Sequence, residues 1–162
     1  IAQATGIKIA QAAGRENIKE INNINNIGLQ LSIIIAIIFA FLLYLFPTNI
    51  TNIFVDIKLS NNKDILSSTI HFIYIIAIYQ IFDSLQTITN SSLRSLKDTL
   101  FPMLIGIISY WVIGLSTGLL LSYYFNLKGI GLWIGLTTGI IILSISLLLR
   151  INKKIKNLNK II

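Results

Sequence analysis

Four long apolar runs dominate the chain, and between them lie short polar connections. The runs occupy about residues 27–46, 66–91, 100–123 and 129–149. A helix of roughly twenty apolar residues is long enough to cross the hydrocarbon core of a bilayer. Because the runs are continuous and do not alternate apolar with polar positions, they predict membrane helices rather than the strands of a barrel.

Composition supports the same class of protein. The 162 residues are 54% hydrophobic and 12% charged, and the mean hydropathy is +0.79. A soluble domain carries about a quarter charged residues, twice this share. We therefore predict an all-α fold, a polytopic membrane bundle of four full transmembrane helices. The chain has no cysteine, which excludes disulfides and thiolate metal sites.

Residues 1–26 are predicted to be the end of a preceding transmembrane helix and a cytoplasmic connection. The opening stretch, IAQATGIKIAQAAG, lacks an initiator Met and reads as the middle of a segment. We expect it to belong to the C-terminal part of a longer protein. Residues 27–149 form the four-helix part, and residues 150–162 a basic tail.

The charged residues alternate along the chain in a way that predicts its orientation. Bases are enriched before the first span, after the second and in the tail: Lys8, Arg15, Lys19, Arg94, Lys97, Arg150, Lys153, Lys154, Lys156 and Lys160. The other connections hold Lys58 and Lys63 balanced by Asp56 and Asp64, and Lys128 alone. The positive-inside rule places the basic connections and the C-terminus in the cytoplasm. Bases beside membrane spans indicate topology and lipid contact, not nucleic-acid binding.

The second span contains an acidic residue, Asp83, within an apolar stretch. On a helical wheel it shares a broad polar side with Tyr79, Gln80, Ser84, Gln86, Thr87, Asn90 and Ser91, while Ile78, Ile81, Leu85 and Ile88 lie opposite. An acidic residue in a span is rare and costly, so it indicates a functional site.

Two interpretations of Asp83 remain open at this stage. It forms an ion pair or hydrogen bond that joins two helices, or it binds a transported cation. In the second case its carboxylate, with the Tyr79 phenol and nearby amides, supplies oxygen ligands for Na⁺. A carboxyl group in a low-dielectric site is also suited to carry H⁺. We take Gln80, Gln86, Thr87 and Asn90 as candidates for lining a substrate cavity.

Small residues in the third and fourth spans predict close helix packing. Gly114 and Gly118 are four residues apart, and Gly131, Gly135 and Gly139 follow at the same interval. Tyr110, Trp111 and Trp133 are interpreted as packing or interface residues, with a cavity for aromatic cations as the alternative. No catalytic motif, cofactor motif or resident metal site is indicated, so we predict that the protein is not an enzyme.

Several stretches together resemble the C-terminal lobe of NorM-type multidrug and toxic compound extrusion (MATE) transporters. They are AIYQIFDSLQTITNSSLRSLKDT, ISYWVIGLSTGLLLSYYF, KGIGLWIGLTTG and the opening GIKIAQAAGRENI. The resemblance extends over nearly the whole chain. It implies a twelve-helix protein of two lobes, of which this chain supplies the end of the eighth helix and the ninth to twelfth. The N-terminal lobe would be missing here.

The resemblance also implies a function and a location. Members of this family export amphipathic, often cationic drugs in exchange for Na⁺ or H⁺ across the bacterial inner membrane. Asp83 matches a cation-coupling aspartate of the tenth helix, and Tyr79 matches a tyrosine one turn earlier. Lys8, Ala10, Ser95 and Ser116 depart from the family pattern. The alternatives are a related lipid-linked sugar flippase and a non-transporting membrane remnant.

Overall fold

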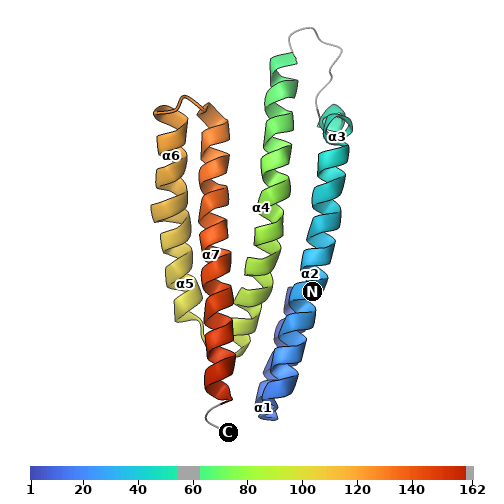
Figure 1. Cartoon of the computed structure of the whole chain (residues 1–162), viewed down its shortest axis with the longest axis vertical. Coiled ribbons are helices and arrows are strands. Elements are labelled where there is room, and N and C mark those ends of the chain that lie inside the picture. Colours follow the sequence, from blue (N-terminus) through green and yellow to red (C-terminus); the bar gives the residue numbers. More distant parts are fainter. Residues whose placement is uncertain (55–62, 160–162) are drawn as a thin grey trace.

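A computed structural model describes residues 1–54 and 63–159 of the chain. All regular structure in these residues is helical (Figure 1). The elements in chain order are α1 (Ala2–Gly14), α2 (Ile18–Leu45), α3 (Pro47–Phe54), α4 (Lys63–Ser95), α5 (Leu100–Ile107), the π-helical segment η2 (Ile108–Gly114), α6 (Leu115–Tyr123) and α7 (Lys128–Leu158).

The four predicted spans are confirmed. Helices long and apolar enough to cross a membrane cover Ile18–Leu45, Ser67–Ser95, Leu100–Tyr123 and Lys128–Leu158. The third span is one continuous run of α5, η2 and α6. Asp56, Lys58 and Lys160 lie outside the described residues, so the charge balance of the connection that holds Asp56 and Lys58 stays a prediction.

Two helices extend well beyond their apolar runs. Helix α2 begins at Ile18, because the side chain of Asn17 accepts a hydrogen bond from the backbone N–H of Glu20 at 3.1 Å. The Asn17 amide in turn donates to the Glu20 carboxylate at 3.1 Å, which closes a box-like cap. The stretch taken from sequence as a polar connection is therefore mostly helix. Helix α7 likewise continues through the basic tail to Leu158.

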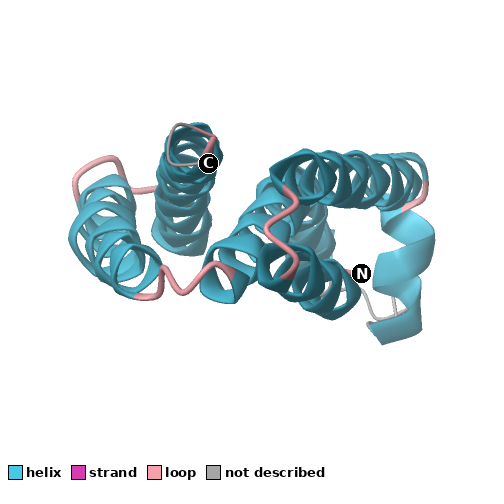
Figure 2. Ribbon diagram, turned by 90° about the horizontal axis from the view of Figure 1, so that it is seen from below, coloured by secondary structure: helices cyan, strands magenta, loops and turns pink. Residues whose placement is uncertain are grey.

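Helix α4 lies at the centre of the bundle (Figure 1). It packs against α7 on one side and against α2 on the other. Helix α6 and η2 pack on α7, and α1 lies against both α2 and α4. The view from below shows α4 between these two groups (Figure 2). Because α4 is central, residues on its polar side are close to both α2 and α7.

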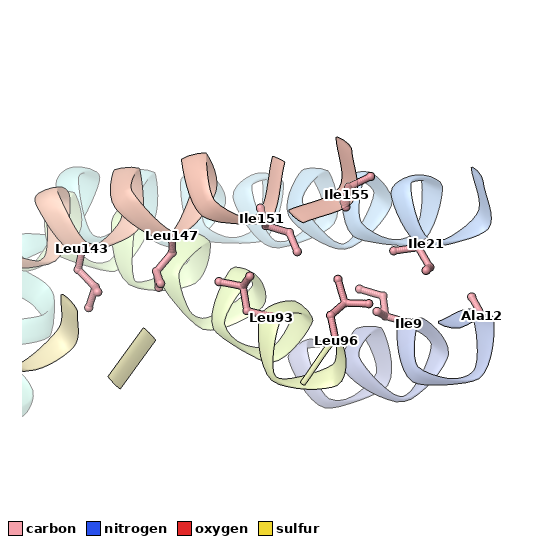
Figure 3. Close-up of a cluster of buried hydrophobic side chains, with 9 residues drawn as sticks. All are labelled: Ile9, Ala12, Ile21, Leu93, Leu96, Leu143, Leu147, Ile151 and Ile155. Atoms are coloured by element: carbon pink, nitrogen blue, oxygen red, sulfur yellow. The ribbon is translucent and has the colours of Figure 1, made fainter. Parts of the chain in front are cut away.

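The buried apolar core gathers at the end of the bundle where α1 and α7 end (Figure 3). Four elements contribute to it, and its members are Ile9, Ala12, Ile21, Leu93, Leu96, Leu143, Leu147, Ile151 and Ile155. Elsewhere the spans bury little: 11% of the most apolar window is buried in Ser67–Ser95, against 39% in Lys128–Leu158. Such exposed apolar surface suits contact with lipid or with further membrane helices.

The glycines of the last two spans lie face to face. A Cβ on Gly135 would collide with the backbone of Gly118. A Cβ on Gly139 would come within 2.6 Å of the Ser109 carbonyl oxygen, and one on Gly131 within 2.6 Å of the Ser122 nitrogen. The absence of side chains at these positions lets the third span and α7 approach to backbone contact.

Candidate cation site on helix α4

Asp83 lies in the wall of a cavity between α4 and α2. The cavity measures about 310 Å³. Helix α4 lines it with Gln80, Asp83, Ser84 and Thr87, and α2 contributes Ser32 together with apolar side chains. The Asp83 side chain is half-buried. The polar surroundings predicted for Asp83 on the second span are thus those of this cavity.

Asp83 has no ion-pair partner within the described part of the chain. The ion pairs there are Arg15–Glu20 and Asp98–Arg150, and no Lys or Arg lines the cavity. A half-buried carboxylate without a counter-charge is costly unless it binds a cation or a proton. The sequence left two interpretations open, and the one that requires an ion pair finds no partner for Asp83 among the described residues.

Tyr79 points toward the other half of the bundle. Its ring meets that of Trp133 on α7 edge to face, with centroids 6.4 Å apart. Its hydroxyl interacts with that of Tyr110 in η2, and Tyr110 is also within electrostatic reach of Asp83. Tyr79, Tyr110 and Trp133 therefore form an aromatic group that connects the neighbourhood of Asp83 to the third and fourth spans.

Gln80 makes a direct contact between helices. Its side-chain amide donates to the backbone carbonyl of Ala36 at 3.1 Å. The Ser84 hydroxyl donates within its own helix, to the Ile81 carbonyl at 2.8 Å. In this conformation Gln80 thus helps to hold α2 on α4, while it also lines the cavity beside Asp83.

The other predicted cavity residues lie farther along α4, around a second cavity of about 640 Å³. Gln86, Thr87, Asn90 and Arg94 line its α4 side, and α1 lines the opposite side. Thr87 and Ala2 border both cavities, so the two adjoin. The structure therefore brings the four candidates to one polar stripe but divides them between two adjoining cavities.

Three features of the site were missed by sequence reasoning. Ser32 lines the same cavity as Asp83 from α2, and its polarity within an apolar run was the only available signal. Tyr110 was assigned to packing. The π-helical turn around it carries no sequence signal. The buried Ser109 lies in this turn, and its hydroxyl has no hydrogen-bond partner among the described residues. Such π-segments often mark functional positions.

These features define a class of protein. A bundle of membrane-spanning helices, with an unpaired carboxylate between adjoining cavities on its central helix, is typical of a membrane transporter.

Comparison with known proteins specifies the family. The MatE family model matches residues 1–120. The probable multidrug resistance protein NorM of Deinococcus radiodurans is 34% identical over 147 residues, which cover 91% of this chain and 33% of that protein. The NorM protein of Synechocystis is 31% identical, with 93% of this chain and 32% of that protein covered. The chain belongs to the MatE family.

Solved structures agree on the fold. A multidrug resistance MATE family transporter in an inward-facing conformation superimposes with a TM-score of 0.87 at 17% identity, covering 98% of this chain and 36% of that one. The eukaryotic MATE transporter AtDTX14 gives a TM-score of 0.79 at 19% identity, covering 97% and 35%. The chain spans about a third of the length of the curated relatives it matches.

Proposed function

We propose that the whole protein is a cation-coupled multidrug efflux antiporter of the bacterial inner membrane, with its C-terminus in the cytoplasm. It exports amphipathic, often cationic compounds by alternating access, and this chain supplies part of its C-terminal lobe. The observation that carries the proposal is Asp83, a half-buried carboxylate without an ion-pair partner among the described residues, in the wall of a cavity.

Cation occupancy at Asp83 drives the exchange. Na⁺ would be held by the carboxylate with hydroxyl and amide oxygens of the stripe, and H⁺ would be held by the carboxyl group itself. Either cation neutralises the charge that attracts a cationic drug. A ligand shifts a conformational equilibrium only through its different affinity for the two states. Coupling therefore requires Asp83 to bind its cation more tightly in one of them.

The aromatic group transmits the state of Asp83 to the third and fourth spans. Tyr79 lies one turn from Asp83 on α4 and contacts Trp133 and Tyr110 on the two neighbouring spans. The π-helical turn that carries Tyr110 is a departure from regular α-helix at this point. We infer that this turn changes its winding as the cavity opens and closes.

The proposal is tested by ethidium efflux from energised cells that lack other pumps and express the full-length protein. Gradients of Na⁺ and H⁺ are imposed separately. Efflux that follows one gradient supports the antiporter and identifies its ion. No efflux under either gradient, with the protein present in the membrane, would overturn it and favour the lipid-linked sugar flippase or the remnant.

A further inference from the structure

A third cavity lies at the basic end of the bundle, away from Asp83. It measures about 370 Å³ and lies among the ends of α1, α4 and α7 and the start of α2. Its apolar lining includes Ile18, Ile21, Leu96 and Leu158, and two bases, Lys97 and Lys154, border it. This volume lies in the range of small-molecule sites.

The two lysines are available to a ligand. Neither forms an ion pair within the described residues, where the neighbouring bases Arg15 and Arg150 are paired with Glu20 and Asp98. Among the described residues, Glu16 is the one carboxylate that borders the cavity. The local charge of the cavity wall is therefore positive, which suits an anion.

The backbone conformation of the rim adds an independent observation. Lys97 and Glu16 both have positive φ, 58° and 55°, in turns where the chain leaves α4 and α1. Glycine is strongly preferred at such helix ends, because other residues are strained there. Helix termination therefore does not explain why a lysine stands at position 97.

The depth of the lysines matches the headgroups of a bilayer. Lys154 is five residues past Leu149, the last residue of the fourth apolar run. At 1.5 Å per residue of helix this is about 7 Å beyond the hydrocarbon edge. The polar layer on each side of a bilayer is roughly 5–7 Å thick. A phosphate held by Lys154 would lie at the outer edge of that layer.

We propose that this cavity binds the headgroup of an anionic phospholipid such as phosphatidylglycerol. Lys97 and Lys154 contact the phosphate, the apolar side chains of the cavity lie beside the rest of the headgroup, and Glu16 limits the affinity. Basic pockets between membrane helices are suited to such lipids. The bound lipid would fasten α1, α4 and α7 together at the end of the bundle that contains the core. This proposal does not depend on the transport function.

The experiment is native mass spectrometry of the full-length protein in detergent, titrated with phosphatidylglycerol or phosphatidylcholine. We expect tighter binding of phosphatidylglycerol. The substitution Lys154→Gln weakens it about five-fold, the usual effect of one base near a membrane surface. Lys153→Gln is the matched control, because Lys153 is the exposed neighbour in the same helix and does not line the cavity. Equal losses in the two variants would overturn the proposal.

Two more variants separate binding from folding. Lys97→Gly removes the base and relieves the backbone, so it should weaken lipid binding while the melting temperature stays equal or rises. Glu16→Gln should strengthen binding, which no folding defect can mimic. Unchanged affinity in both variants, or displacement of the lipid by millimolar inorganic phosphate, would exclude a phospholipid as the occupant.

Discussion

At the residue scale, two aspartates in this chain show how surroundings decide a role. Asp98 is buried, and its carboxylate accepts a 2.8 Å hydrogen bond from Nε of Arg150, whose guanidinium lies 4.8 Å from the centre of the Phe101 ring. Asp83 is half-buried with no such partner among the described residues. The first holds the α4–α5 connection on α7, and we propose that the second binds a cation.

This contrast gives a stability prediction. Asp98→Asn should lower the free energy of unfolding by about 2 kcal/mol, because it leaves a partly buried guanidinium without its counter-charge. Asp83→Asn should leave it unchanged or raise it, since it breaks no ion pair among the described residues and removes an uncompensated charge. Thermal unfolding of the full-length protein in detergent measures both. Glu20→Gln is the control for an exposed pair and should cost at most about 1 kcal/mol. An Asp83→Asn loss as large as that of Asp98→Asn would contradict the account.

A second prediction concerns the aromatic group. Tyr79→Phe should slow coupled efflux about three- to ten-fold, because it removes the hydroxyl that interacts with Tyr110 and keeps the ring against Trp133. Tyr74→Phe removes a hydroxyl from the same helix, where the ring packs on Tyr44. It should leave efflux unchanged in the same assay. Similar rates in the two variants would dissociate Tyr79 from coupling.

The sequence predicts which residues of α4 share its polar side, but not which residues of other helices they contact. Helical periodicity alone puts Asp83, Gln80 and Thr87 on one side of a helix. It does not say that Gln80 would bond to α2, nor that Tyr79 would contact Trp133 some fifty residues later. Such contacts depend on how helices pack, which no local pattern encodes.

At the element scale, backbone contact between the third span and α7 depends on glycine. Gly135 lies against the backbone of Gly118, which cannot rotate away from an added methyl group. Gly106, by contrast, has nothing within 4 Å of the position where a Cβ would be. The two positions form a natural pair for testing the packing.

We expect Gly135→Ala to destabilise the protein by about 1–3 kcal/mol, because the two helices must separate. Gly106→Ala should be neutral or stabilise by up to about 1 kcal/mol through helix propensity. Thermal unfolding in detergent compares them. Equal behaviour of the two alanine variants would mean that the spans do not pack through these glycines.

Hydropathy predicts the spans well and their ends poorly. The bilayer fixes the length of an apolar run, whereas hydrogen bonds fix the length of a helix. Asn17 starts α2 nine residues before its apolar run, and α7 continues for nine residues after Leu149. The π-helical turn in the third span has no signal in hydropathy or propensity, and it lies where the span meets Gly139.

At the scale of the whole molecule, the central position of α4 relates these features to each other. Its polar stripe borders the adjoining cavities. Its neighbour α2 lines the cavity that holds Asp83, and its neighbour α7 carries Trp133, which contacts Tyr79. Comparison shows the family and the fold, whereas cation coupling at Asp83 is our proposal. This proposal concerns the full-length protein, because the chain spans only about a third of the length of its relatives.

The most direct test compares Asp83→Asn with the unaltered full-length protein in ethidium efflux under the gradient that drives transport. Membrane levels are matched by immunoblotting. We predict that the variant inserts normally but that its efflux no longer responds to the gradient. An amide is uncharged and does not titrate, so it can supply neither the negative charge nor the proton-binding group that coupling requires. Gradient-driven efflux by Asp83→Asn at the rate of the unaltered protein would contradict it.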